Sequence, residues 1–178
     1  CDILLLPTHA DDEILFFGSI MPTYASELGY RVQVVYLTRH IATPQRDHEL
    51  LNGLWHSGQK FYPVFSTIPD YYTATYKTAL KTYKGLDFQK FQVDVIRRFK
   101  PEVIIGHDLN GEYGHGQHCM VADAALQAYD LAATEGEYLD SFFAYDVWQV
   151  KKLYLHLWEE NQIRFDWSVP LESMNGKT

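Results

Sequence analysis

Cysteine is scarce in this 178-residue sequence, which contains only Cys1 and Cys119. Two cysteines cannot build a disulfide framework, and Cys119 falls inside a helical pattern, where a buried free thiol is the usual explanation. The sequence also lacks the run of about 18 apolar residues that a membrane-spanning helix would need. Internal repeats and low-complexity tracts are missing as well. These absences argue against a disulfide-stapled module, a membrane-spanning chain and a repeat protein.

Positive charge is in short supply too, with 15 Lys and Arg against 23 Asp and Glu and a net charge of −8. The basic residues are scattered except for Arg97, Arg98 and Lys100, so we expect no nucleic-acid partner. The length and the 47% hydrophobic content are typical of one globular domain. We expect residues 1–178 to form a single domain, taken from a longer protein. The sequence leaves its compartment and oligomeric state open.

Short apolar runs alternate along the chain with amphipathic segments of helix length. The pattern predicts strands at 3–7, 32–38, 61–66 and 103–105, and helices at 13–28, 46–56, 86–99 and 115–133. Pro22 is expected to kink or divide the first helix. This alternation predicts a three-layer α/β/α, Rossmann-like domain with a mostly parallel sheet. Apolar and polar residues alternate at 152–158 and 162–167, which predicts a C-terminal β-hairpin or edge strands.

Polar residues follow several of the predicted strands. His9 ends the first strand, Arg39 the second, and His107 and Asp108 the fourth. Parallel α/β sheets bind ligands beyond the carboxyl ends of their strands, so we expect these groups to share one edge of the sheet. His107 is placed to contact a ligand-binding residue there, although packing is the commoner role of such a histidine.

The stretch THADDEILFFG, residues 8–18, places an imidazole and three carboxylates at a strand-to-helix junction. A helix start favours acids, which accounts for Glu13 and for one further carboxylate such as Asp11 as a cap. It does not account for His9 beside two consecutive aspartates. A strand-end His followed three positions later by Asp12 can direct both side chains to one metal ion.

A second cluster, GEYGHGQH at 111–118, places His115 and His118 three residues apart at the start of a predicted helix. Either histidine alone is more often a cap or a core residue. Together with the first cluster, however, they predict a metal site formed by His9, Asp12 and His118. Two histidines and one carboxylate leave a coordination position open, as in catalytic zinc sites.

The remaining polar groups suit hydrolysis of an amide. Zinc lowers the pKa of a bound water to about 7, and Asp11 is a spare carboxylate that can accept the proton as the water attacks a carbonyl. His115 and Tyr113 can stabilise the oxyanion or protonate the leaving amine. The alternatives are that His115 only caps its helix and that Tyr113 only packs.

Both clusters resemble the signatures of the PIG-L/LmbE-like deacetylases, a family of zinc-dependent enzymes that remove acetyl groups from N-acetylglucosamine compounds. The family signature (A/S/T)HxDDE is matched at 8–13, and its later HxxH is matched at 115–118. The resemblance covers most of the chain. It implies that His9, Asp12 and His118 are zinc ligands and that Asp11 is the general base. It also implies that His115 is the acid or oxyanion partner, that Tyr113 supplies a carbonyl-polarising hydroxyl, and that Arg46 and Asp70 bind sugar hydroxyls.

Two positions depart from the family pattern. Ala10 stands where many members have Pro, and Gln117 stands where several have an Asp that orients the acid histidine. The tyrosine-rich segment 71–84 either lines the site or covers the sheet.

The sequence thus predicts a metal-dependent N-deacetylase acting on a small-molecule or glycan substrate that carries an N-acetyl amino sugar. Zn²⁺ is the expected cofactor, with Fe²⁺ or another divalent ion also compatible. One alternative is a sugar-binding domain without activity, for which Gln117 is the hint. Another is a non-heme iron oxygenase, which uses the same ligand set but is disfavoured by the predicted parallel sheet and the extra base. The resemblance to secreted bacterial proteins favours an extracytoplasmic location.

Overall fold

The protein is described here by a computed structural model of residues 1–178. Its strands and helices alternate for most of the chain, as the sequence predicts. In chain order the elements are β1 Ile3–Leu5, α1 Asp12–Leu15, the π-helix η1 Met21–Glu27, β2 Val32–Tyr36, α2 Gln45–His56, β3 Val64–Phe65, α3 Tyr76–Thr82, α4 Phe88–Phe99, β4 Val103–Gly106, the 3₁₀ turn η2 Glu112–Gly114, α5 Gly116–Leu131, α6 Leu139–Tyr145, β5 Lys152–Leu155 and the 3₁₀ turn η3 Glu172–Met174.

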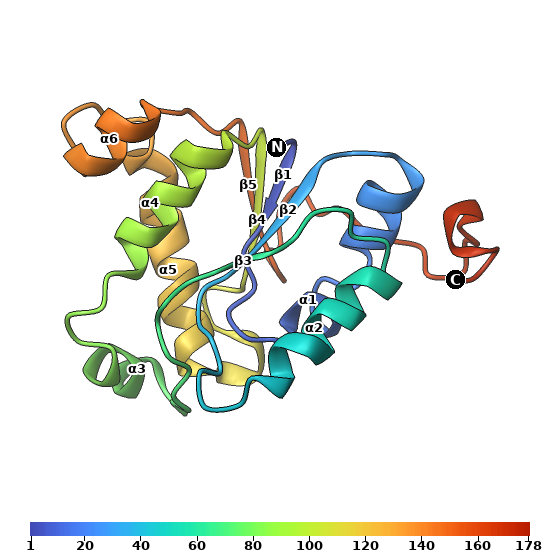
Figure 1. Cartoon of the computed structure of the whole chain (residues 1–178), viewed down its shortest axis with the longest axis horizontal. Helices are drawn as coiled ribbons and strands as arrows, with labels where there is room; N and C mark the ends of the chain where they lie inside the picture. The colour runs from blue at the N-terminus through green and yellow to red at the C-terminus, as the bar shows by residue number, and fades with distance from the viewer.

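The five strands form one parallel sheet in the order β3-β2-β1-β4-β5 (Figure 1). The first strand of the chain is its centre, because Ile3 is in register with Val32 of β2 on one side and with Val103 of β4 on the other. With all strands parallel, their carboxyl ends lie at the same edge. Residues that follow β1 and β4 are therefore neighbours in space.

Helices cover both faces of the sheet, with α3 to α6 on one side and α1 and α2 on the other (Figure 1). The alternation of β1 sends Leu4 to one face, and Ile3 and Leu5 to the opposite face. Leu4 belongs to a core of 19 buried residues shared with α4 and α5, and Leu5 to a core of 11 shared with η1 and α2. The predicted three-layer α/β/α fold is confirmed.

The predicted helix 13–28 is divided, and the division comes before Pro22. The chain forms α1, passes through a turn at 16–19, and resumes helical structure around Ile20 and Met21. Pro22 then lies at the start of η1, where its missing N–H leaves no hydrogen bond unmade. The turn brings Phe16 and Phe17 back toward the carboxyl edge of the sheet, where both rings contact His107.

The prediction of a C-terminal hairpin is wrong, whereas the alternative prediction of an edge strand is confirmed by β5. β5 pairs parallel to β4, with Gly106 in register with Leu155, and residues 162–167 form no strand. The chain turns after β5 through Leu157 and Asn161, both with positive φ, and then runs away from the sheet edge. Phe165 packs against Tyr24 instead. Phe165 is the one residue of 162–167 that is not exposed, so the strand-like alternation of the sequence does not correspond to alternating burial.

Arg97 is fully buried and is not part of a basic surface. Its guanidinium donates hydrogen bonds to five backbone carbonyls, those of Leu131, Ala132, Thr134, Glu137 and Tyr138. It ties the end of α5 to the start of α6. None of the helices is both long enough and apolar enough to cross a bilayer.

Candidate metal centre

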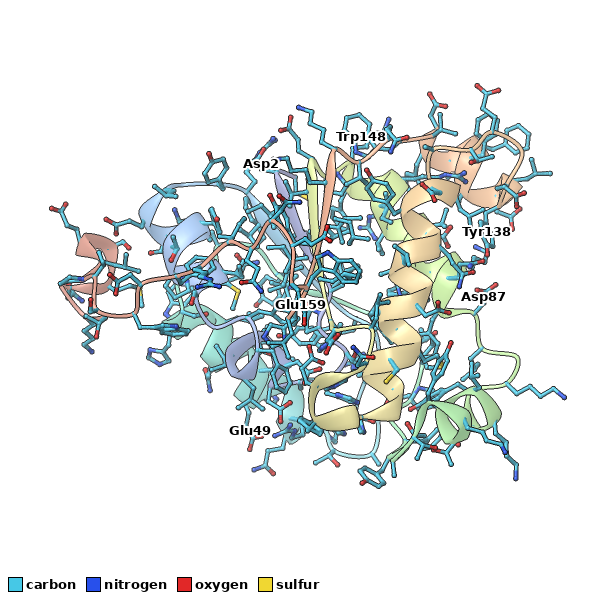
Figure 2. All side chains as sticks on the ribbon, turned by 180° about the vertical axis from the view of Figure 1, so that it is seen from behind. Asp2, Glu49, Asp87, Tyr138, Trp148 and Glu159 are labelled. Carbon is cyan, nitrogen blue, oxygen red and sulfur yellow. The ribbon has the colours of Figure 1, made fainter.

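The side chains predicted to hold a metal meet at the carboxyl edge of the sheet. His9 lies beyond the end of β1, Asp12 is the first residue of α1, and His118 is in the first turn of α5. In Figure 2, Asp2 marks the amino end of β1, and Glu49 on α2 marks the opposite edge, where these residues gather.

Three potential donor atoms form a nearly equilateral triangle. Nδ1 of His9 lies 3.2 Å from Oδ2 of Asp12 and 3.0 Å from Nε2 of His118. The third side, from Nε2 of His118 to Oδ2 of Asp12, is 3.3 Å. A tetrahedral zinc ion with bonds of about 2.0–2.2 Å separates its ligand atoms by roughly 3.3 Å. The donor set and its spacing are therefore compatible with a divalent metal.

His107 lies beside this triangle but is poorly placed to join it. Its ring is stacked on that of His118, with centroids 4.2 Å apart and planes inclined by 13°. In-plane lone pairs of parallel stacked rings do not converge on one ion. Moreover, Nε2 of His107 accepts a hydrogen bond from the N–H of Thr8 (3.0 Å). His107 therefore contacts the candidate ligand Asp12, with Nε2 3.3 Å from Oδ2, without being part of the donor triangle.

The second ring nitrogen of His9 is held by Gln117. Nε2 of His9 lies 2.9 Å from the amide oxygen of Gln117, which can only accept, so Nε2 carries the proton and Nδ1 keeps a free lone pair. The Gln117 amide in turn donates to the hydroxyl of Tyr83 (2.7 Å). Gln117 therefore supports the candidate ligand His9 and makes no hydrogen bond to His115. This contact weakens the one sequence argument for a domain without activity.

The Asp12 carboxylate is almost fully buried and strongly hydrogen-bonded. Its Oδ2 accepts from the N–H groups of Thr8 (3.1 Å) and His9 (2.7 Å). Burial alone would raise the pKa of Asp12, but the close contacts with the rings of His107, His118 and His9 outweigh burial and hold the pKa far below the usual range. Asp12 is thus an ionised ligand across the working pH range of proteins.

Asp11 points to a different neighbour. Its Oδ2 accepts a hydrogen bond from Arg46 (3.0 Å), and its carboxylate makes no hydrogen bond to the three donor residues. Its backbone is strained, with φ at 148°, and its N–H donates to Oε2 of the buried Glu13 (3.0 Å). Arg46 also donates to the carbonyl of Ala10. The predicted base and one predicted substrate residue are therefore paired with each other.

His115 and Tyr113 lie side by side at the opening of the site. The His115 ring is 5.0 Å from that of His9 and 4.6 Å from that of His118. His115 occupies the N-cap position of α5 but makes no side-chain cap hydrogen bond, so the capping alternative is wrong. Burial, together with the charge of the neighbouring histidines, lowers the pKa of His115 to about 4. Tyr113 is 78% exposed and its ring lies 5.8 Å from that of His115.

Asp70 lies close to the ligand His9. Its Oδ1 is 3.7 Å from Nε2 of His9, and its Oδ2 is 3.0 Å from Nε2 of His40. The tyrosine-rich segment contributes on two sides: the exposed Tyr72 ring lies 5.7 Å from that of His115, whereas Tyr83 is buried beneath Gln117. The segment therefore both lines the site and packs on the fold.

Sequence reasoning missed the residues that support the ligands from behind. Gln117 was noted only as a departure from a family pattern, and Glu112, inside the GEYGHGQH stretch, was not singled out. A buried acid next to the HxxH pair is a signal that could have identified Glu112. A groove of about 780 Å³, lined by residues of η1 and β5, includes Phe16 and His156 but none of the three donor residues.

Converging donor atoms of two histidines and a carboxylate, placed where parallel sheets bind their ligands, put the protein in the class of α/β domains with a metal-type centre. Within that class the chain belongs to the PIG-L family. The family model "PIG-L: GlcNAc-PI de-N-acetylase" matches residues 4–129, which confirms the family resemblance seen in the sequence.

The curated relatives are similarly named. A 1D-myo-inositol 2-acetamido-2-deoxy-alpha-D-glucopyranoside deacetylase from Catenulispora acidiphila is 28% identical over 182 residues, covering 85% of this chain and 54% of the relative. A deacetylase of the same name from Nocardioides sp. is 26% identical, covering 91% of this chain and 64% of the relative. This chain thus spans about half the length of the first of these relatives.

Solved structures share the fold at low identity. The conserved protein TT1542 from Thermus thermophilus has a TM-score of 0.70 at 19% identity, covering 98% of this chain and 73% of its own. N,N'-diacetylchitobiose deacetylase from Pyrococcus horikoshii has a TM-score of 0.73 at 14% identity, covering 93% of this chain and 63% of its own.

Proposed function

We propose that the protein is a metal-dependent N-deacetylase that hydrolyses the acetamido group of an N-acetylglucosamine-type sugar or glycoconjugate. The observation that carries the proposal is the triangle of donor atoms from His9, Asp12 and His118, with sides of 3.0–3.3 Å. Membership of the PIG-L family and the names of the relatives support the choice of reaction and substrate class.

His9, Asp12 and His118 would hold the ion, and zinc is the first choice because nitrogen and carboxylate ligands at this spacing suit it. Bound there, a divalent ion supplies a Lewis acid and a water of lowered pKa. The protein's own contribution is to place a base, hydrogen-bond donors and substrate contacts around that position.

Asp11 is the proposed general base. It lies in the chain between the ligands His9 and Asp12, so its position is fixed relative to both. The strained backbone at Asp11 is held by Glu13, and the carboxylate is held by Arg46. Strain of this kind persists only where the surroundings enforce it and is concentrated at functional sites.

His115 is assigned to the oxyanion rather than to a cationic acid. With a pKa of about 4 its imidazole is neutral near pH 7, and a neutral imidazole can still donate one hydrogen bond. Its buried Nδ1 has no hydrogen-bond partner in the protein, so no carboxylate is in place to stabilise a positive charge. Tyr113, exposed beside it, would add a second donor to the amide carbonyl.

Arg46 and Asp70 are proposed to bind sugar hydroxyls. They flank the donor triangle on two sides, Arg46 through Asp11 and Asp70 through its 3.7 Å approach to His9. Charged groups form short hydrogen bonds to hydroxyls, so both can orient the ring that carries the acetamido group.

The test compares metal content with acetate release from a panel of N-acetyl amino sugars. Asp11→Asn should keep near-stoichiometric zinc while kcat falls about 10²–10⁴-fold, the usual range for a general base. His118→Ala should lose both zinc and activity. Asp130→Asn, on the exposed far end of α5, is the matched control and should change neither. Near wild-type turnover by Asp11→Asn would overturn the assigned base, and a wild-type protein without zinc after reconstitution would overturn the metal-dependent reaction.

A further inference from the structure

Glu112 is a buried carboxylate on which three histidines meet. It opens η2 and is 3% exposed. Oε2 lies 2.7 Å from Nδ1 of His107 and 2.8 Å from Nδ1 of His118. Oε1 lies 2.9 Å from Nδ1 of His156 and accepts the N–H of Asp108 (3.1 Å). Both oxygens are therefore occupied, from elements far apart in the chain.

A carboxylate this deeply buried is stable only if its charge is compensated. Here the nitrogens of three imidazoles and the N–H of Asp108 surround the two oxygens of Glu112. Glu112 is therefore present as an anion, able to accept at both oxygens. An amide in its place could accept at only one.

The orientation of His118 leaves little choice of tautomer. Its Nε2 is a corner of the donor triangle, and its buried Nδ1 lies 2.8 Å from Oε2 of Glu112, in a contact without hydrogen-bond geometry. A neutral imidazole carries one proton, and the negative charge of the nearby carboxylate favours that proton on Nδ1, which leaves the Nε2 lone pair free for a metal. With the proton on Nε2 instead, two lone pairs would face each other across 2.8 Å.

We propose that Glu112 is a positioning residue for the metal ligand His118: its carboxylate fixes the Nδ1–H tautomer, so that Nε2 is directed into the donor triangle. The inference rests on the metal site of the proposed function and assigns a role to a residue outside that site. Such carboxylate–histidine–metal arrangements raise the basicity of the ligand, and their loss commonly weakens metal binding about 10–100-fold.

Two further histidines fix Glu112 itself. His107 ends β4 and His156 follows β5, so the carboxylate is attached to two neighbouring strands of the sheet as well as to its own turn. His107 also accepts the Thr8 N–H, which defines its own donor as Nδ1–H toward Glu112. Through Glu112, the position of His118 is fixed relative to the sheet as well as to the first turn of α5.

The experiment measures zinc affinity of the full chain by competition with a chromophoric chelator. Glu112→Gln keeps the side-chain volume but turns an NH₂ group toward one of the histidine N–H groups, so the zinc Kd should rise about 10–100-fold. Glu102→Gln, an exposed carboxylate paired with Lys151 at the amino end of β4, removes the same charge and should leave Kd unchanged. Equal Kd for Glu112→Gln and wild type would overturn the inference while leaving the proposed function intact.

A second measurement needs no variant. Long-range ¹H–¹⁵N NMR of the zinc-loaded wild-type protein should show His118 protonated at Nδ1 and bound to metal through Nε2. Metal bound through Nδ1 would overturn the inference, even if Glu112→Gln failed to fold. Absence of zinc binding by the wild type would overturn both this inference and the metal-dependent reaction.

Discussion

The histidine ligands depend on the atoms that face their second ring nitrogens. His9 is supported by the neutral amide of Gln117 and His118 by the charged carboxylate of Glu112. A neutral acceptor makes the ring less basic than a carboxylate does, so the two ligands are not equivalent. The Gln117 amide also connects His9 to Tyr83, whose pKa is raised to about 12 by burial, which keeps its hydroxyl protonated.

Gln117→Leu should weaken zinc binding. Leucine has a similar length but no acceptor, so the Nε2–H of His9 would be buried without a partner and the ring could rotate away from the triangle. We expect the zinc Kd to rise roughly 10-fold or more by chelator competition. Gln127→Leu, on the exposed side of the same helix, is the control. An unchanged Kd for Gln117→Leu would show that His9 needs no such support.

At the residue scale, the sequence could predict which side chains lie close together but not which of them form hydrogen bonds with each other. The carboxyl ends of parallel strands share one edge of the sheet, so the pattern could place His9, Asp12 and His118 at that edge; the structure adds that β1 and β4 are adjacent. The contact between Gln117 and His9 joins residues 108 positions apart and depends on the rotation of α5 about its axis. The pairing of Asp11 with Arg46 depends likewise on how α2 lies against the β1–α1 turn.

The first turn of α5 is packed directly against the backbone before α3. A Cβ built on Gly116 would lie 2.0 Å from the carbonyl oxygen of Thr75, and the Gly116 N–H donates to the carbonyl of Thr73 (3.2 Å). Glycine is required because the two backbones approach so closely. This packing places His115 and His118, on either side of Gly116, at the edge of the site.

Gly116→Ala should destabilise the protein by roughly 1–3 kcal/mol, because the added methyl must displace backbone. Gly53→Ala is the matched control within α2, where the nearest atom to a new Cβ is 3.9 Å away. It should be neutral or stabilise by about 0.5–1 kcal/mol, since alanine favours a helix over glycine. Urea unfolding curves followed by circular dichroism would measure both. Equal midpoints for Gly116→Ala and wild type would contradict the close packing.

At the element scale, long periodic segments were predictable and short or irregular ones were not. The predicted helices 46–56 and 86–99 correspond closely to α2 and α4. α6 was not predicted, because its seven residues gain their position from α4 and Arg97 rather than from a strong pattern of their own. The segment 162–167 alternates like a strand, yet it forms none in the structure.

The whole molecule is organised around one sheet that separates two cores. Each core uses side chains from the same strands, so neither half has a complete interior without the other. This supports the proposal that residues 1–178 act as one domain. The metal site lies where the β1 and β4 halves of that sheet meet.

Zinc should therefore stabilise the whole fold. A ligand that binds only the folded state at 100 times its Kd contributes about 2.7 kcal/mol, which corresponds to roughly 5–10 °C in Tm for a chain of this size. Differential scanning calorimetry with and without EDTA would measure the shift, and His118→Ala should show none. Burial would lower the pKa values of His9 and His118, but the contacts with Asp12 outweigh burial and raise both above the usual 6.5. Because histidine ligands must lose their protons to bind, the zinc-dependent shift should shrink as the pH falls through these raised values. A shift of equal size in His118→Ala would place the stabilising ion elsewhere.

The central position of β1 in the sheet also determines when, during synthesis, the sheet can form around it. The partner of Ile3 in β4, Val103, is synthesised 100 residues after Ile3. At about 5–20 residues per second, one edge of β1 stays without its partner strand for roughly 5–20 seconds of synthesis. His118 is also made after this interval, so until then His9 and Asp12 lack the third residue of the donor triangle. The site therefore cannot form before α5 begins to be made, and an unpaired strand edge is exposed to chaperones or to aggregation until β4 emerges.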